Sequence, residues 1–160
     1  LEYGLYGIAL SRFSGMWVGF KAITETVESA MSFELPPYRQ FVMPSDFVAP
    51  ATGLHYRGPD FPGPQIEERL EAKKAATLAF AAANPIDHKI FDVPNAKFGI
   101  VTSGKAHLDL MEALRLLGIG ADEARRIGVD VYKVGMVWPL EPSGALDVVQ
   151  GKDEGLVVEE

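Results

Sequence analysis

The pattern of apolar and polar positions is most informative at residues 98–105, which read FGIVTSGK. A short apolar run stops at residues 102–104, and the residues that follow, including Leu108 and Met111, are apolar at spacings of three or four. An apolar run between turn signals predicts a buried strand, and the spacing after it predicts a covering helix over 105–117. This segment is the first half of a βαβ unit.

Two further apolar runs, VDVYKV at 129–134 and GLVV at 155–158, complete the pattern. Connections of roughly a dozen residues or more are too long for the tight turns of antiparallel neighbours and predict a parallel sheet. Short helices are expected at 120–127, where acidic residues open and basic residues close the segment, and near 143–149. The predicted fold class is α/β, an incomplete three-layer sandwich with a short parallel sheet (βαβαβ), preceded by helices and a Pro-rich linker.

The order of the three strands decides which faces of the sheet are covered. If the first predicted strand lies between the second and the third, a spatial order of 2-1-3, the right-handed crossover rule places the two connections on opposite faces. A parallel sheet needs cover on both faces. Missing cover would invite self-association, so we expect a homodimer or an apolar edge that adheres to other surfaces.

In the first third of the chain, the spacing of apolar residues predicts helices. Residues 1–13 have helical spacing, with Ser14-Gly15 as a stop. Residues 16–31 also fit one helical face, although 16–20 fit a strand equally well, and the length of the pattern favours the helix. Trp17 falls outside the main apolar stripe, and packing in a core or interface is the expected role for it.

Residues 33–64 carry seven of the eleven prolines and predict an extended linker with at most one short strand at 40–43. A helix is expected over 64–83. Its apolar face is expected to hold Ile66, Leu70, Lys73 or Lys74, Thr77 and Ala81. Aromatic residues are unusual in a solvated spacer, so the linker is expected to lie against another domain. These aromatic residues are Tyr38, Phe41, Phe47, Tyr56 and Phe61.

Composition excludes several classes of function. With 15 basic and 22 acidic residues the net charge is −7, and no basic cluster is present, so nucleic-acid binding is not expected. Cysteine is absent, which removes disulfides and thiolate or iron–sulfur ligation. His55, His88 and His107 lie far apart in the sequence without an H-x-x-x-H spacing, so no metal site is expected. No apolar run is long enough for a membrane span.

One motif carries candidate chemistry. Residues 99–106, GIVTSGKA, resemble the phosphate-binding G-x-x-x-x-G-K-[ST], but Ala106 lacks the hydroxyl that binds magnesium and half of the loop is strand. A weaker anion site at Ser103, Gly104 and Lys105 remains, since amides at a helix start can hold an anion. The alternative is that Ser103 caps the helix and Gly104 permits a tight turn. No catalytic residue can be assigned, because no Ser/His/Asp or Cys/His arrangement is present.

Four stretches together resemble a known enzyme family: GLYGIALSRFSGMWVGFKAITETVES at 4–29, FGIVTSGKAHLDLMEALRLLGI at 98–119, VYKVGMVWPLEP at 131–142 and GLVVEE at 155–160. They are similar to the indolepyruvate ferredoxin oxidoreductases, within the thiamine-diphosphate-dependent 2-oxoacid:ferredoxin oxidoreductases. The resemblance implies an internal fragment of such an enzyme. Residues 1–43 would end a pyrimidine-binding-type domain, 44–97 would be the Pro-rich linker and helix, and 98–160 would begin a transketolase C-terminal-like domain.

The resemblance also implies a reaction for the parent protein. A cytoplasmic oxidoreductase of this family oxidatively decarboxylates an arylpyruvate such as indolepyruvate to an acyl-CoA and passes the electrons through 4Fe-4S clusters to ferredoxin. Thiamine diphosphate and magnesium would be held outside these residues, as would the cluster cysteines and every catalytic group. The role expected of the chain itself is architectural, with other domains or subunits as its partners. The alternative from the residues alone is a small α/β anion-binding module that uses Ser103, Gly104 and Lys105.

Overall fold

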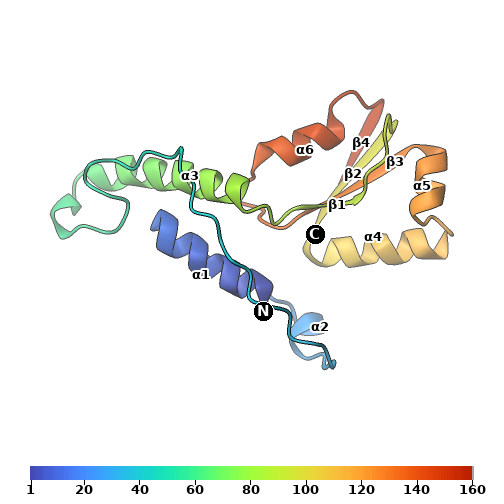
Figure 1. The fold of residues 1–160 in the computed structure, drawn as a ribbon, viewed down its shortest axis with the longest axis horizontal. Helices are drawn as coiled ribbons and strands as arrows, with labels where there is room; N and C mark the ends of the chain where they lie inside the picture. The colour runs from blue at the N-terminus through green and yellow to red at the C-terminus, as the bar shows by residue number, and fades with distance from the viewer. Residues whose placement is uncertain (160) are drawn as a thin grey trace. The chain divides into compact units, whose positions relative to one another are not determined.

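A computed structural model describes residues 1–159, and the chain divides into two compact units, Leu1–Asn84 and Pro85–Glu160 (Figure 1). The first unit contains three α-helices and one 3-10 turn. They are α1 (Glu2–Ser14), α2 (Thr24–Val27), η1 (Gly58–Asp60) and α3 (Gln65–Ala83). The prediction for residues 1–13 is confirmed, because α1 ends where Gly15 adopts a φ of +70° and its N–H bonds to the carbonyl of Ser11.

The helix predicted over 16–31 is wrong. Within these residues, all of them described, only the four residues of α2 are helical, and none of the four is buried. Trp17 is 98% exposed, which also contradicts the expected core packing within this unit. Most helical stability comes from packing of an apolar face, and the stripe of residues 16–31 has no surface in this unit to pack against.

The core of the first unit is an aromatic cluster around Phe80 of α3, which is fully buried. The rings of Tyr6, Phe13 and Phe41 lie between 5.4 and 6.0 Å from the Phe80 ring in edge-on or tilted arrangements. Phe41 belongs to the Pro-rich stretch, which is therefore held by aromatic contacts inside its own unit. The strand considered at 40–43 does not form; every residue there is described and none is in a strand.

Polar side chains fasten the same stretch to α3. The side-chain amide of Asn84 accepts a bond of 2.7 Å from the Val42 N–H and donates one of 2.8 Å to the Val42 carbonyl. Arg69 donates to Asp60 at 2.7 Å, and both side chains are nearly buried. The predicted apolar face of α3 is therefore right at Thr77 and Ala81, which are buried. It is wrong at Ile66 and Leu70, which are 40% and 41% exposed while Arg69 is buried.

The second unit is built on a four-stranded sheet with the order β1-β3-β2-β4. The three predicted strands are present and all parallel. The first of them in the sequence, β2, lies between the second, β3, and the third, β4, which is the order 2-1-3 considered above. The sheet has a fourth strand that the sequence did not predict, which pairs antiparallel with β3. The strands are β1 (His88–Phe91), β2 (Phe98–Ser103), β3 (Val129–Val134) and β4 (Glu154–Val158).

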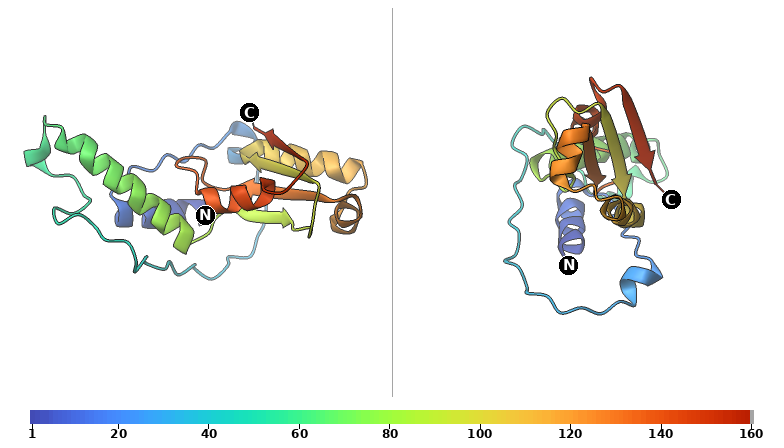
Figure 2. Two further views of the ribbon diagram at one scale, coloured as in Figure 1. Left: turned by 90° about the horizontal axis from the view of Figure 1, so that it is seen from above. Right: turned by 90° about the vertical axis from the view of Figure 1, so that its right-hand side faces the viewer.

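Helices lie on both faces of this sheet, as Figures 1 and 2 show. The helices are α4 (Gly104–Leu116), α5 (Ala121–Ile127) and α6 (Pro142–Val149). Leu114 of α4 packs with Ile100 and Val131 on one face, whereas Val148 of α6 packs with Tyr132 and Val134 on the other. The predicted α/β fold with cover from opposite sides is therefore confirmed.

Candidate functional site

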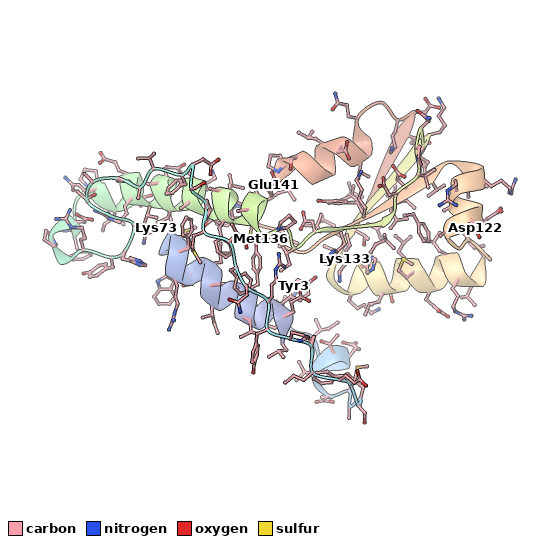
Figure 3. The ribbon with its side chains drawn as sticks, viewed as in Figure 1. Tyr3, Lys73, Asp122, Lys133, Met136 and Glu141 are labelled. Atoms are coloured by element: carbon pink, nitrogen blue, oxygen red, sulfur yellow. The ribbon has the colours of Figure 1, made fainter. Side chains whose placement is uncertain are left out.

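The carboxyl ends of β2 and β3 are where open parallel sheets usually hold ligands. Thr102 of β2 pairs with Lys133 of β3, and Lys133 pairs in turn with His88 of β1. Because alternate strand residues share a face, Thr102 lies on the same face as Ile100, the face that α4 covers. His107 stands in the first turns of α4, and Figure 3 shows Lys133 beside the start of this helix.

His107 is a buried titratable group at this end of the sheet whose pKa is shifted. Burial lowers its pKa below the ordinary value of 6.5, and the positive charges of Lys133 and His88 lower it further. The imidazole is therefore neutral at neutral pH. His107 Nδ1 and Thr102 Oγ1 are buried, and neither has a hydrogen-bond partner among the residues that the structure describes.

The predicted anion-binding residues lie at the junction between β2 and α4. Ser103 is the N-cap residue of α4, but its side chain makes no capping hydrogen bond. Gly104 has a φ of +52°, a conformation that glycine adopts without strain, so the tight turn is confirmed. The ammonium group of Lys105 lies 2.7 Å from Asp109 of the same helix. The helix amides are thus the groups this junction offers to an anion, and anion binding there stays a prediction.

The opposite face of the same sheet end is organised by Asp87. Its carboxylate accepts a hydrogen bond of 2.7 Å from the N–H of Gly135 and one of 3.0 Å from the hydroxyl of Tyr132. Burial, followed by the negative charge of Asp87, raises the pKa of Tyr132 above its ordinary value of 10.0. The phenol lies directly under Gly144 of α6, where any side chain would collide with its oxygen. Tyr132 is thus a fixed structural donor and is not poised as a nucleophile.

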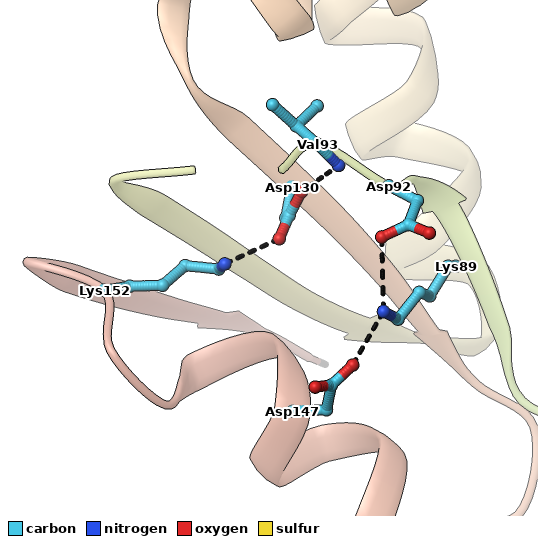
Figure 4. A network of polar contacts seen from close by, with 6 residues as sticks. All are labelled: Lys89, Asp92, Val93, Asp130, Asp147 and Lys152. Carbon is cyan, nitrogen blue, oxygen red and sulfur yellow. Dashed lines mark hydrogen bonds and ion pairs between the residues drawn. The ribbon is translucent and has the colours of Figure 1, made fainter. Parts of the chain in front are cut away.

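The amino end of the sheet holds a buried ion pair (Figure 4). Lys152 lies 2.6 Å from Asp130, and each side chain is only 9% exposed. The second carboxylate oxygen of Asp130 accepts a bond of 2.6 Å from the N–H of Val93. Nearby, Lys89 bridges two exposed carboxylates, Asp92 at 3.2 Å and Asp147 at 2.6 Å. These contacts tie loops and helix α6 to the strands of the sheet.

The donor set does not fit the cofactors that the resemblance implies. Among residues 1–159 no group of three or more His, Cys, Asp or Glu side chains could hold a metal ion. The sequence has no cysteine, so it offers no thiolate to an iron–sulfur cluster. No reaction step through thiamine diphosphate, magnesium or a cluster can therefore be derived from these side chains.

Sequence reasoning treated the three histidines as unrelated, yet in the fold His88 lies near enough to His107 to help lower its pKa. Their 19-residue separation spans a loop, β2 and the start of α4, and only the pairing of β1 with β3 brings His88 beside Lys133. The one available signal was the position of His107 after a predicted strand end. Arg125 and Arg126, by contrast, pair with Asp122 and Glu123 on their own helix.

In the part of the chain that the structure describes, no helix has the length and apolar character required to cross a membrane.

Comparison with known proteins adds one likeness. No curated protein and no solved structure matches the chain. Residues 88–160 match the family model described as the indolepyruvate oxidoreductase domain, a range that includes all four strands of the sheet. The sheet-bearing part of this protein is thus similar to the indolepyruvate oxidoreductase domain.

Proposed function

We propose that the chain is an architectural part of an oxidoreductase that oxidatively decarboxylates an arylpyruvate, such as indolepyruvate, to an acyl-CoA with ferredoxin as electron acceptor. The observation that carries the proposal is the family match over 88–160, which begins at the first residue of β1 and runs through the whole sheet. The match in this unit agrees with the resemblance that motifs at 98–119 and 131–142 had indicated.

The architectural role is supported by how the buried polar groups are used. Asp130 and Lys152 neutralise each other, and Asp87 binds Tyr132 and the backbone of Gly135. Catalytic acids and bases need accessible groups with tuned pKa values. Here Tyr132 and His107, the buried groups whose pKa values are shifted, are only 5% and 7% exposed. We therefore assign thiamine diphosphate, magnesium, the 4Fe-4S clusters and the CoA site to other parts of the same enzyme.

The test is an anaerobic assay of the complete enzyme that contains these residues. Indolepyruvate, CoA and thiamine diphosphate should together support reduction of ferredoxin, and omission of any one should abolish it. The 160-residue chain alone should neither reduce ferredoxin nor bind thiamine diphosphate in calorimetry. A complete enzyme that is inactive with all arylpyruvates would contradict the reaction, whereas micromolar binding of thiamine diphosphate by the chain alone would contradict the architectural role.

A matched pair of substitutions separates architecture from catalysis in that assay. Lys152→Ala removes one partner of the buried pair and should lower the stability and yield of the enzyme while the activity per folded molecule stays unchanged. Lys97→Ala, at an exposed pair with Asp153, should change neither. A Lys152→Ala enzyme that is fully folded but inactive would show that this side chain takes part in the reaction, contrary to the proposal.

A further inference from the structure

Two buried polar side chains beside the start of α4 have no hydrogen-bond partner among the residues that the structure describes. They are the hydroxyl of Thr102 and Nδ1 of His107, and these residues are only 2% and 7% exposed. A buried polar group without a partner is costly, and folded proteins usually satisfy such a group with protein atoms, water or a bound ion. The two side chains therefore point to a bound species at this junction.

Both side chains lie between the sheet and the first turns of α4. Thr102 is two residues after Ile100 on β2, so it faces α4 as Ile100 does. His107 precedes Leu114 by two helical turns and so belongs to the face of α4 that contacts the sheet. The helix begins at Gly104, two residues after Thr102. The two side chains are therefore aimed at the amino-terminal turns of α4.

The same turn offers backbone donors that no side chain caps. An α-helix leaves the N–H groups of its first turn without a partner inside the helix, and the Ser103 side chain makes no capping hydrogen bond to them. The space at Gly104 is open, because a Cβ placed there would meet no group beyond its own helix and chain neighbours within 4 Å. Gly104 is also exposed, so a small ion can reach these amides from solvent.

The local charge favours an anion over a water molecule. The first turn of α4 has no acidic side chain, so no residue in it offsets the partial positive charge of the helix start. Lys133 of β3 and His88 of β1 lie near enough to lower the pKa of His107 by their positive charge. Asp109, one turn further along α4, has its charge opposed by Lys105 at 2.7 Å. A negative ion at the helix start thus meets mainly positive potential.

The number of donors around this turn suits a phosphate group. A carboxylate has two oxygens, whereas a phosphate has at least three strong acceptor oxygens, and helix starts bind phosphate through their amides. We propose that the junction of β2 and α4 binds a phosphate group, whose oxygens accept from the amides of residues 104–106, the Thr102 hydroxyl and Nδ1 of His107. Neither side-chain atom is open to solvent, so binding includes a local shift of the first turn of α4. The site goes beyond the proposed reaction and does not depend on it.

Calorimetry with the 160-residue chain in a phosphate-free buffer tests the site. Inorganic phosphate should bind saturably with a Kd below about 5 mM, and acetate should bind at least about tenfold more weakly. Glycerol phosphate, an ester, separates the two sources of the group. Ester binding as tight as that of inorganic phosphate identifies a phosphate monoester as the occupant, whereas weaker ester binding identifies the free ion.

Three threonine variants test the location. Thr102→Val removes the hydroxyl and nearly keeps the side-chain shape, so it should weaken phosphate binding by about tenfold. It should not lower the thermal stability of the phosphate-free chain, because the hydroxyl has no partner in the described part of the chain. Thr102→Ser keeps the hydroxyl and should bind within about threefold of the unmodified chain. Thr77→Val is the matched control, at a buried threonine of α3 whose hydroxyl bonds to the Lys73 carbonyl, and should leave phosphate binding unchanged.

Nuclear magnetic resonance of the imidazole groups gives a readout that a purely structural His107 would not give. The His107 resonances should shift with added phosphate along the same saturation curve that calorimetry measures. Far-ultraviolet circular dichroism of each variant should match that of the unmodified chain, which separates loss of the site from loss of the fold.

Three results would overturn the proposal and leave the proposed reaction untouched. The first is no saturable binding of inorganic phosphate by the folded chain up to about 50 mM. The second is equal binding of acetate and phosphate, since charge attraction alone would then explain the affinity. The third is an unchanged affinity for phosphate in folded Thr102→Val.

Discussion

The Lys152 ammonium group lies 2.6 Å from the Asp130 carboxylate with both side chains only 9% exposed. Lys152 belongs to the loop between α6 and β4, whereas Asp130 belongs to β3, so the pair spans the intervening strand β2. The alkyl chain of Lys152 crosses β2 at Gly99, the residue that pairs with both Asp130 and Gly155. Lys152 therefore fastens the loop before β4 to the strand two positions away.

Removing one member of this pair should be costly. Lys152→Ala leaves a buried carboxylate without its counter-charge and should lower the free energy of unfolding by about 3–5 kcal/mol in urea denaturation. The double variant Lys152→Met with Asp130→Asn removes both charges and keeps an acceptor for the Val93 N–H, so it should recover most of the loss. Lys97→Ala is the control: its pair with Asp153 is exposed and is worth about 0–1 kcal/mol. Equal losses in Lys152→Ala and Lys97→Ala would contradict the argument.

Gly99 of β2 should not tolerate a side chain, whereas Gly155, its pairing partner on β4, should tolerate one. A Cβ at Gly99 would lie 2.7 Å from the Val148 carbonyl oxygen and 3.2 Å from the Lys152 side chain. Gly99→Ala should therefore cost about 1–3 kcal/mol, because the backbone of α6 must move. A Cβ at Gly155 would make only ordinary contacts, with Val149 Cγ1 at 3.6 Å and the Gly99 carbonyl oxygen at 3.9 Å, so Gly155→Ala should cause no loss of stability. Thermal unfolding of the two variants side by side measures the difference, and a Gly99→Ala variant as stable as Gly155→Ala would refute the close approach.

Tyr132 should make stability fall at high pH. Its pKa is raised in the fold, so the folded state keeps the phenol proton at pH values where the unfolded chain, near the ordinary 10.0, has lost it. The stabilisation is complete below pH 10 and declines as the pH rises further. Tyr132→Phe should cost about 0.5–1.5 kcal/mol at neutral pH through the lost bond to Asp87, and the gap between the two proteins should narrow from about pH 9 to 11. A gap that stays constant over this range would show that Tyr132 titrates normally.

His107 should make stability fall at low pH. Burial and the charges of Lys133 and His88 lower its pKa, so the unfolded chain gains the proton first as the pH drops below 6.5. The free energy of unfolding should decrease between about pH 7 and 5, and His107→Gln should reduce this slope. His55→Gln, at an exposed histidine, is the control for replacing an imidazole elsewhere in the chain. The measurement is urea denaturation at a series of pH values, and equal slopes in His107→Gln and the unmodified chain would count against a lowered pKa.

Much of the second unit followed from sequence pattern because its signals are local. Apolar runs of strand length, helical spacing after residue 104 and a glycine at the end of α5 each report on the few residues around them. The parallel arrangement followed from connection length, and the order 2-1-3 is the one for which crossover geometry places helices on both faces. Residues 88–91 lacked such a signal, since His88 and Lys89 begin a four-residue edge strand whose pairing is decided by β3.

The first unit shows the limit of the same reasoning. The periodicity of residues 16–31 predicted a helix, but periodicity only states which face would be buried if a partner surface existed. In α3 the buried face is the one that holds Arg69 and Phe80, because Asp60 and the rings of α1 and the Pro-rich segment meet it there. Those partners are distant in sequence, so no window of α3 contains them.

The sequence by itself determined the fold class, the three parallel strands and the absence of thiolate chemistry, because these depend on local periodicity and on residue counts. Tertiary structure alone decided that Lys152 reaches Asp130 and that Lys133 and His88 lie near enough to His107 to lower its pKa. The physical reason is distance along the chain: burial and electrostatic coupling act through space, between groups that only folding brings within a few ångströms.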